Sequence, residues 1–316
     1  MKYGFGVDLG GTTVKIAYFE ETGKMLDKWE IPTVVENNGV KILPDIADSL
    51  QAYIEKNGIS RQDLLGIGLG VPGPVENNGV VHRCENLFWG VFNVSQQLQE
   101  LIGLPVKAGN DANMAALGEC WLGGGQNCRN MVLVTLGTGV GGGIVIDGNI
   151  VAGALGAAGE IGHLVLCREE TEACNCGKYG CAEQYCSATG AVRLARRRMA
   201  KDNTPSVLRN KEPLACKDVF DAANAGDGLA QEVLEQYFCL LAELIANVCN
   251  VINPEAVVIG GGVSKAGQVL LDGVQKYFKR FAFHGNHDVR FALANLGNDA
   301  GAYGAFKLAL DAFGNQ

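Results

Sequence analysis

The chain has 316 residues, of which 47% are hydrophobic and 19% charged, so it can build one large or two medium domains. Its formal net charge of -8 disfavours nucleic acid and anionic membranes as partners. The 11 cysteines, an odd number, lie in a sequence that opens without an export signal. We therefore expect free thiols and a metal site in the reducing cytoplasm, and no disulfide framework.

The first part of the chain predicts three strands, a helix and a fourth strand. Residues 3–33 are rich in Val, Ile, Tyr and Phe around two turns, which is typical of strand, turn, strand, turn and strand. Residues 40–58 place apolar side chains at helical spacing, and Gly58 is a plausible stop. Residues 64–75 predict a buried strand that ends in the turn Pro72-Gly73-Pro74.

The rest of the chain repeats this alternation. Residues 105–124 predict a strand followed by a helix, and residues 130–151 predict strand, glycine turn and strand. Residues 256–278 predict strand, glycine turn and helix, and residues 289–310 a closing strand and helix. The apolar stretch 237–252 is interrupted by one glutamate and two asparagines, so it predicts a buried helix and not a membrane span.

Two short sequences occur twice. Val7–Thr13 resembles Val134–Val140, and Gly109–Ala112 recurs as Gly297–Ala300. Two similar α/β lobes would produce these echoes. Because the second copy of Gly-Asn-Asp-Ala lies near the C-terminus, we expect the last helix to return and pack on the N-terminal lobe.

Glycine turns follow three apolar strands, at Gly10-Gly11, at Gly137–Gly143 and at Gly260–Gly262. Such turns can bring backbone N–H groups close to a phosphate. One turn alone would be an ordinary hairpin, but three favour a nucleotide held between two lobes. The sequence contains neither a Walker A pattern nor the spaced Rossmann fingerprint.

The stretch CNCGKYGCAE, residues 174–183, gathers three cysteines that predict a metal site. Cys174, Cys176 and Cys181 could supply three of the four ligands of a tetrahedral zinc ion, although their spacing is not the usual Cys-x2-Cys. A fourth ligand would come from His163 upstream or from Cys186. A nearby basic run, residues 196–198, is interpreted as a solvated helix face.

Taken together, six motifs resemble one family. VDLGGTTVKIAYF, VPGPV, GNDANMAALGE, LVTLGTGVGGGIV, GEIGH and CNCGKYGCAE occur in this order and are similar to bacterial glucokinases of the ROK family, in the actin-like ATPase superfamily. The resemblance covers essentially the whole chain. It implies an α/β, two-lobed actin-like ATPase (ribonuclease H-like) fold with the active site in the interlobe cleft. The smaller lobe would comprise residues 1–118 and the helix 299–316, and the larger lobe residues 119–298 with the zinc-binding segment.

The resemblance also implies an activity, the ATP-dependent phosphorylation of glucose at its 6-hydroxyl. Alone, Asp111 would be read as a helix cap, but the resemblance makes it the general base. Gly73 and Asn110 are expected beside it in the sugar site, whereas Asp299 in the second copy has no implied base role. Asp8 is expected to reach Mg2+, through water. The residues implied in holding ATP are Gly10, Gly11, Thr12, Thr13, Lys15, Thr138, Gly139, Gly261 and Gly262.

For the cysteine cluster, the resemblance implies that His163 is the fourth ligand of a structural Zn2+ ion. It assigns Glu160, His163 and Glu183 to the sugar hydroxyls, which carboxylate and imidazole groups recognise well. The zinc ion would therefore build the sugar site without touching the phosphate. The resemblance further implies a homodimer, with a small-molecule sugar and ATP as the other partners.

Three alternatives remain open at this stage. The first is a ROK kinase for N-acetylmannosamine, N-acetylglucosamine, fructose or allose, with specificity set by Glu85–Val94. The second is a sugar-sensing repressor, which would need a DNA-binding domain before the first glycine turn; Asp8 comes too early in this sequence for one. The third is a structural zinc protein, which would leave the glycine turns and the Asn-Asp pair unexplained.

Overall fold

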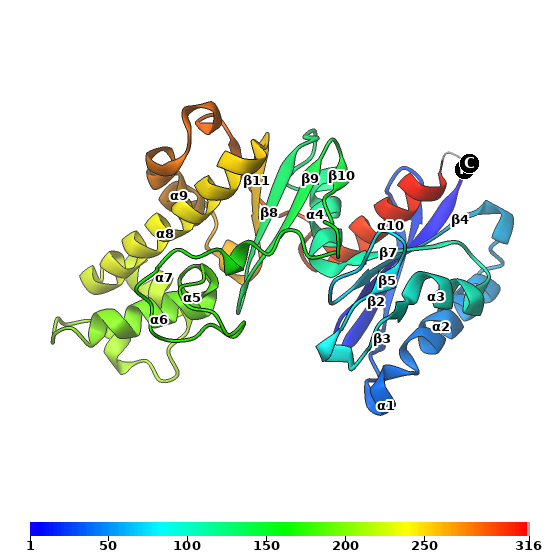
Figure 1. Ribbon diagram of the computed structural model, residues 1–316, viewed down its shortest axis with the longest axis horizontal. Coiled ribbons are helices and arrows are strands. Elements are labelled where there is room, and N and C mark those ends of the chain that lie inside the picture. Colours follow the sequence, from blue (N-terminus) through cyan, green and yellow to red (C-terminus); the bar gives the residue numbers. More distant parts are fainter. Residues whose placement is uncertain (315–316) are drawn as a thin grey trace. The chain divides into compact units, whose positions relative to one another are not determined.

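A computed structural model describes residues 1–314 (Figure 1). Its contacts divide the chain into two compact units. The first unit comprises Met1–Arg129, Gly143–Gly159 and the chain from Asn295 onward. The second comprises Asn130–Gly142 and Glu160–Ala294.

The first unit contains a five-stranded sheet of the order β3-β2-β1-β4-β7. Strands β1, β2 and β3 form an antiparallel meander, and β4 and β7 continue the sheet parallel to β1. The strands are β1 (Tyr3–Leu9), β2 (Thr13–Glu20), β3 (Met25–Pro32), β4 (Leu64–Val71) and β7 (Val106–Asn110). A separate two-stranded ribbon pairs β5 (Val80–Val81) with β6 (Phe92–Asn93).

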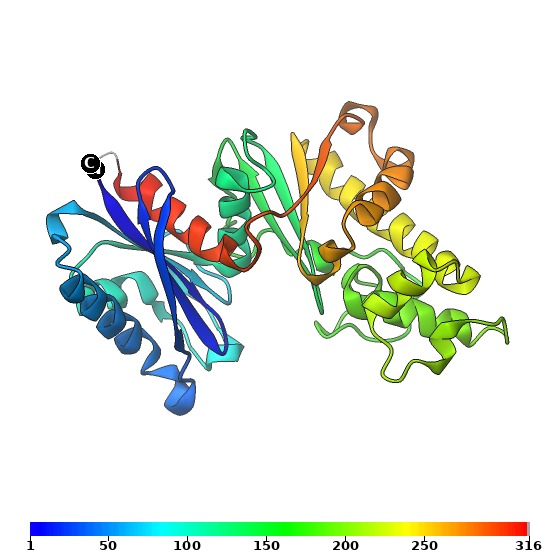
Figure 2. The ribbon, with the colours of Figure 1, turned by 180° about the vertical axis from the view of Figure 1, so that it is seen from behind.

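Helices cover both faces of this sheet. They are α1 (Glu36–Gly39), α2 (Ile42–Lys56), α3 (Val94–Ile102), α4 (Asp111–Leu122) and α10 (Ala300–Phe313). On β2, Ile16 and Tyr18 face the apolar cluster of α2 and α3, whereas Ala17 and Phe19 pack with Phe306 of α10. Figure 2 shows α10, in red, along the strands on the face away from α2. The predicted return of the last helix to the N-terminal strands is therefore confirmed.

The second five-stranded sheet has the order β10-β9-β8-β11-β12, which repeats the arrangement of the first. Its strands are β8 (Met131–Leu136), β9 (Val140–Ile146), β10 (Asn149–Ile150), β11 (Ala256–Gly260) and β12 (Arg290–Leu293). Strands β8, β11 and β12 run parallel, and β9 and β10 pair antiparallel. The first echo in the sequence therefore corresponds to the β1–β2 and β8–β9 turns.

The second unit carries most of its helices on one large apolar core. They are α5 (Glu183–Cys186), α6 (Ala188–Met199), α7 (Cys216–Asn224), α8 (Gly228–Ile252) and α9 (Gln268–Phe281). Short 3₁₀ helices occur across both units at Arg61–Asp63, Glu85–Leu87, Ile161–His163, Val207–Asn210, Gly262–Ala266, His284–Asn286 and Gly297–Asp299. The apolar stretch 237–252 is part of α8, as predicted. No helix in residues 1–314 combines the length and apolarity needed to cross a membrane.

The unit boundaries differ from the lobes expected from the sequence, which were 1–118 with 299–316, and 119–298. The first unit continues to Arg129, includes residues 143–159 and resumes again at Asn295. Glu119 joins the part of the unit that ends at Arg129 to the part that begins at Asn295. Its buried carboxylate accepts hydrogen bonds from the backbone of Gly124, Asn295 and Leu296 at 2.8–2.9 Å. A carboxylate can satisfy several backbone donors in this way only if they converge on it.

Candidate active site

Asp111 lies at the junction of β7 and α4, at the carboxyl end of a parallel strand. Its neighbour Asn110 is the helix cap: Asn110 Oδ1 accepts the backbone N–H of Asn113 at 3.1 Å. The interpretation of Asp111 as a mere cap is therefore wrong. Asn110 Nδ2 donates to Gly73 O and to Asp111 Oδ1, both at 3.0 Å, so the three predicted sugar-site residues of this unit lie together.

The Asp111 carboxylate is poised to accept a proton. Its Oδ1 is engaged by the N–H of Ala112 at 2.8 Å, whereas no hydrogen bond to Oδ2 is found within residues 1–314. Burial raises the pKa of Asp111 to about 6, the N–H of Ala112 opposes this shift, and the carboxylate of Asp8 adds to it. A carboxylate with a pKa near neutrality is a better general base than an ordinary aspartate.

Asp8 lies at the end of β1, opposite Lys15 of β2. Burial raises the pKa of the Asp8 carboxyl, and the Lys15 ammonium, 3.8 Å from Oδ2, partly offsets the increase. Lys15 Nζ also donates to the backbone oxygen of Asn298 at 3.1 Å. Lys15 is thus tied to the start of α10 and is not a free strand side chain.

The β1–β2 turn exposes Gly11 and the Thr12 side chain at its tip. Its base is closed by the Gly10 N–H, which donates to Thr13 O at 3.0 Å. The hydroxyl of Thr33, which follows β3, donates to Gly10 O at 2.7 Å and further fixes the turn. The exposed backbone and hydroxyl at the tip suit an oxyanion.

Asp299, in the second copy of Gly-Asn-Asp-Ala, has a different environment from Asp111. It makes no side-chain capping bond to α10, and its Oδ2 pairs with Lys28 Nζ at 2.7 Å. The same four letters therefore give a carboxylate with a raised pKa in one copy and an ion pair in the other. Each copy does begin a helix, and α4 and α10 contact each other.

In the second unit, the β8–β9 turn is held by Glu183. Glu183 Oε2 accepts the Val140 N–H at 3.0 Å, and a Cβ added at Gly139 would lie 2.1 Å from the same oxygen. Only glycine leaves room for the carboxylate there. The Thr138 side chain is exposed at the tip of the turn, and the Thr189 hydroxyl donates to Thr138 O at 2.8 Å.

Gly261 and Gly262 follow β11 and are both exposed. Gly261 has a φ of 83°, and a Cβ there would lie 2.5 Å from the backbone oxygen of Leu136 in β8. The second unit thus carries two glycine turns, one after β8 and one after β11, and these strands are neighbours.

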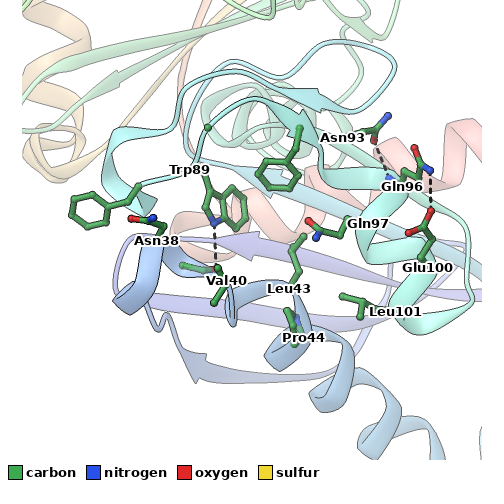
Figure 3. Close-up of a pocket in the computed structure, with 14 residues that line it drawn as sticks. Asn38, Val40, Leu43, Pro44, Trp89, Asn93, Gln96, Gln97, Glu100 and Leu101 are labelled. Atoms are coloured by element: carbon green, nitrogen blue, oxygen red, sulfur yellow. Dashed lines mark hydrogen bonds between the residues drawn. The ribbon is translucent and has the colours of Figure 1, made fainter.

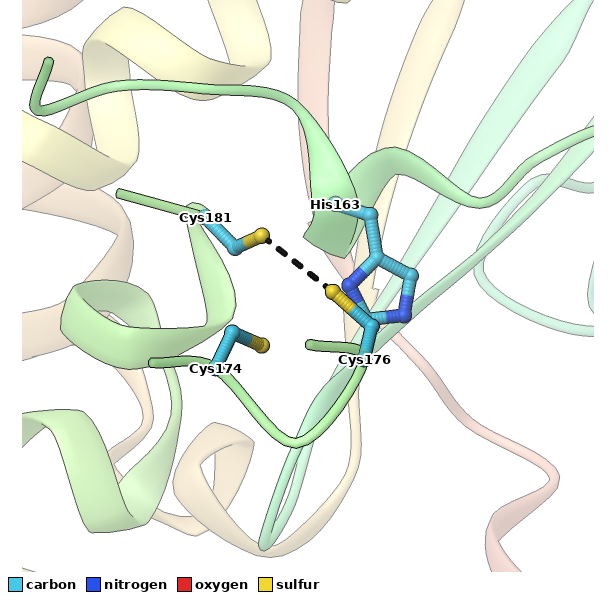
Figure 4. A group of neighbouring side chains, drawn as sticks. All are labelled: His163, Cys174, Cys176 and Cys181. Atoms are coloured by element: carbon cyan, nitrogen blue, oxygen red, sulfur yellow. Dashed lines mark hydrogen bonds between the residues drawn. The ribbon is translucent and has the colours of Figure 1, made fainter. Parts of the chain in front are cut away.

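His163, Cys174, Cys176 and Cys181 form a compact group in the second unit, and their side chains converge (Figure 4). One ligand atom from each lies within 4.8 Å of all the others. His163 Nδ1 is buried and has no hydrogen-bond partner within the described chain, 1–314. An orphaned imidazole nitrogen among three thiols fits a metal ion, and a set of three sulfurs and one nitrogen suits tetrahedral zinc. Cys186, the rival ligand, is fully buried outside this group.

Glu160 and Glu183 lie next to this cluster. The other nitrogen of His163, Nε2, lies 4.0 Å from Glu160 Oε2, and the Glu160 side chain is 65% exposed. Glu183 Oε1 lies 3.8 Å from Cys174 Sγ. The three predicted sugar ligands of the second unit are therefore all adjacent to the cluster or part of it.

Two adjoining grooves run from the cysteine cluster along α6. One, of about 310 Å³, is lined by Cys174, Glu183 and Thr138 among others. The next, of about 560 Å³, shares Thr138 and Thr189 with it and continues to Arg196 and to Leu214, Ala215 and Cys216. Sequence reasoning missed this second groove, because its apolar wall comes from residues without a motif.

The basic run is only partly a solvated face. Arg196 is exposed, but Arg197 forms two hydrogen bonds with the buried carboxylate of Glu170 and Arg198 pairs with Glu232. The prediction overlooked these partners because they lie 27 and 34 residues away in the sequence.

The expected specificity loop Glu85–Val94 contributes in part to the core of the first unit. Leu87 and Trp89 are buried, and the Trp89 indole N–H donates to Gly39 O at 3.3 Å. Trp89 and Phe92 line a pocket of about 610 Å³ with residues of α2 and α3 (Figure 3). Phe88, exposed and in the left-handed region at a φ of 57°, is the loop's free aromatic side chain.

The two similar sheets, each with glycine turns at its strand ends, define a protein of the actin-like ATPase fold class. The chain belongs to the ROK family, whose profile matches residues 4–312. The family resemblance read from the sequence is thereby confirmed.

Individual relatives support the same placement. The chain is 45% identical to a glucokinase of Halalkalibacterium halodurans, over 95% of this chain and 92% of that protein. It is 33% identical to a glucokinase of Thermotoga maritima, over 98% of both chains. Among solved structures, a ROK family glucokinase from Streptomyces griseus in complex with glucose and AMPPNP matches with a TM-score of 0.72 and 31% identity, over 98% of this chain and 99% of that one.

Proposed function

We propose that this protein transfers the γ-phosphoryl group of ATP to the 6-hydroxyl of glucose. The observation that carries the proposal is the Asp111 carboxylate, which has an open oxygen, a raised pKa and a hydrogen-bonding amide, Asn110, beside it. Glucose as the sugar and ATP as the phosphoryl donor are inferred from the glucokinases to which the chain is similar.

In the proposed reaction, Asp111 Oδ2 accepts the proton of the sugar 6-hydroxyl as that oxygen attacks the γ-phosphorus. The new O–P bond forms while the bond from the γ-phosphorus to the β–γ bridging oxygen breaks, and ADP leaves. Asn110 holds the sugar side of the site in place, since its two N–H groups donate to Gly73 O and to Asp111 Oδ1.

The phosphates are assigned to the glycine turns. In the first unit, the exposed backbone of Gly10–Thr13 and the Lys15 ammonium would hold them. In the second unit, Thr138 and Gly139 would do so, with the nucleoside in the groove that runs along α6 and with Gly261 and Gly262 as further contacts. Mg2+ bound through the Asp8 carboxylate would supply charge neutralisation on the phosphates.

Glu160, His163 and Glu183 are assigned to glucose hydroxyls, and His163 with the three cysteines to a structural Zn2+ ion. With His163 Nδ1 directed into the cluster, Nε2 stays free for a hydroxyl. This division lets one imidazole serve the metal and the sugar at once.

The proposal is tested by incubating the protein with Mg2+, ATP and single sugars, and measuring ADP release. Glucose should be turned over far faster than N-acetylmannosamine, N-acetylglucosamine, fructose or allose. A different preferred sugar would contradict the substrate while leaving the Asp111 chemistry intact. No turnover of any sugar by folded, zinc-loaded protein would overturn the proposed function.

Two further properties are part of the proposal. The family resemblance implies a homodimer, which sedimentation of the purified protein would test. It also implies a cytoplasmic enzyme, in keeping with a chain rich in cysteine.

A further inference from the structure

Glu170 lies in the loop before Cys174, and its side chain is only 2% exposed. Its Oε1 accepts the backbone N–H groups of Thr171 and Glu172, both at 2.9 Å. The carboxylate thereby folds its own loop, residues 170–172, four residues before Cys174. A buried carboxylate is costly unless charged partners and hydrogen bonds compensate it.

Two arginines and a tyrosine supply that compensation. Arg197 donates from both terminal nitrogens, one to each Glu170 oxygen, at 3.0 Å. Arg193 Nη2 lies 2.8 Å from Oε2, and the Tyr185 hydroxyl donates to the same oxygen. The hydrogen bonds from Arg197 are the largest cause of a pKa of Glu170 well below its usual range. The carboxylate is therefore anionic and fully engaged.

These partners belong to the elements that follow the cluster. Tyr185 lies on α5, two residues after Glu183, and the arginines lie on α6. Arg193 also pairs with Glu172 at 2.7 Å, so the loop before Cys174 is attached to α6 at two positions. We call residues 164–182 the cysteine segment. It is bonded to α6 through Glu170 and Glu172, and Glu170 also accepts hydrogen bonds from the backbone of the segment.

The other end of α6 is attached to the β8–β9 turn. The Ala188 N–H donates to Gly137 O, and the Thr189 hydroxyl donates to Thr138 O, each at 2.8 Å. Ser187 caps the helix by accepting the Gly190 N–H at 2.9 Å. One short helix therefore contacts the Gly137–Gly139 turn at its start and Glu170 two turns later.

We propose that Glu170 is a positioning residue that fixes the cysteine segment to α6, and thereby couples the metal cluster to the Gly137–Gly139 turn. The nucleotide part of this inference rests on the proposed function, which assigns that turn to ATP; the metal part does not. Coupling of this kind is reciprocal in binding free energy: a nucleotide analogue on the turn strengthens metal binding, and metal loss weakens nucleotide binding. We expect the stronger metal binding to be visible as slower metal release.

The test compares Glu170→Gln with a matched control, Glu232→Gln. Glu232 of α8 pairs with Arg198 of α6, but its side chain is exposed. Both variants are loaded with Zn2+, checked for native circular dichroism, and mixed with excess chromophoric chelator with and without AMPPNP. Glu170→Gln should release zinc about tenfold faster than the wild type, in line with lost support of a ligand shell. It should also lose the slowing by AMPPNP and raise KM for ATP more than it lowers kcat.

A double variant, Glu170→Gln with Arg197→Gln, separates positioning from stability. Removing one charge of each sign leaves Arg193 paired with Glu172, so the double variant should recover most of the thermal stability lost in the single variant. If Glu170 positions the cluster, fast zinc release persists in the double variant. If zinc release returns to the wild-type rate together with stability, Glu170 has only a structural role and the proposal is wrong.

The remaining outcomes are also decisive. Zinc release from Glu170→Gln at the rate of Glu232→Gln overturns the proposal. Fast zinc release that AMPPNP slows equally in both proteins retains the positioning role and refutes the coupling. If the wild type phosphorylates no sugar, the proposed function fails, but the zinc-release comparison still decides the role of Glu170.

Discussion

The carboxylate of Glu183 and the backbone N–H of Val140 are joined by a hydrogen bond of 3.0 Å, which connects the residue after the cysteine segment to the β8–β9 turn. Gly139 makes this bond possible, because a Cβ there would lie 2.1 Å from Glu183 Oε2. One carboxylate assigned to the sugar therefore also shapes a turn assigned to ATP.

Gly139→Ala should therefore weaken the binding of both glucose and ATP, although it removes no polar group. The added methyl must push the Glu183 carboxylate away from Val140, and KM for glucose and for ATP should each rise by about tenfold or more, the cost of one displaced polar group. Steady-state kinetics with each substrate varied in turn measure this. Gly228→Ala, where a Cβ meets nothing within 4 Å, is the control. A KM increase confined to ATP would show that Glu183 does not touch the sugar.

Asp111→Asn should abolish most of the turnover while leaving the fold intact. The amide oxygen can still accept the Ala112 N–H, but the side chain can no longer take a proton. Loss of a general base typically costs a factor of about 10²–10⁴ in kcat. Glucose binding, measured by calorimetry, should be nearly unchanged. Asp299→Asn alters the other Gly-Asn-Asp-Ala copy and is the matched control; it loses only an ion pair with Lys28. Wild-type kcat in Asp111→Asn would eliminate Asp111 as the base.

The pH dependence follows from the raised pKa of Asp111. Because the base must be deprotonated, kcat/KM for glucose should fall below about pH 6, near the pKa of about 6 that burial gives this carboxyl. Asp8→Asn removes a neighbouring negative charge, so the acidic limb should move to lower pH. A pH profile of the wild type and of Asp8→Asn, taken at saturating Mg-ATP, measures both effects. An unmoved limb in Asp8→Asn would contradict the electrostatic link between the two carboxylates.

The same shift predicts an effect on stability, with a defined sign. The folded Asp111 binds its proton more tightly than the unfolded one, whose pKa is near 3.8, so its contribution to stability falls as pH rises from about 4 to about 6. Asp111→Asn should therefore gain thermal stability over the wild type at pH 8 and lose this advantage near pH 4. Calorimetric scans at the two pH values measure the difference. An equal gain in thermal stability at both pH values would mean that it does not come from the ionisation of Asp111.

The sequence predicts a structural feature well when the residues that determine it are close together in the chain. The strands, the helices and the glycine turns follow from periodicity and turn residues, and the structure confirms them. The Asn110 cap of α4 was assigned to the wrong neighbour, because Asn and Asp are both good caps and one position separates them. Only the hydrogen bond from Asn113 decides between them.

Features with distant partners escaped prediction. The Arg197–Glu170 pair joins residues 27 positions apart, and the two bonds from Glu119 to the chain before α10 span more than 170 positions. Trp89 was expected near the sugar, yet its indole N–H is satisfied by Gly39, fifty residues upstream. Nothing in local spacing reports such contacts, so the lobe boundaries and the role of the basic run could not be read from the sequence.

The metal cluster gives the last prediction, and Cys176 is the best position to test it. Cys174 and Cys181 are buried, so replacing them would disturb packing as well as ligation, whereas Cys176 is exposed.

Wild-type protein should hold about one zinc ion per chain, as four ligands in one cluster require. Cys176→Ser should hold far less and lose glucose affinity, because His163 and the two glutamates that flank the cluster are no longer fixed. Zinc content by mass spectrometry and glucose binding by calorimetry check this, with Cys239→Ser, a cysteine of α8 outside the cluster, as the control. A folded Cys176→Ser protein that lacks zinc but binds glucose normally would show that the metal does not build the sugar site.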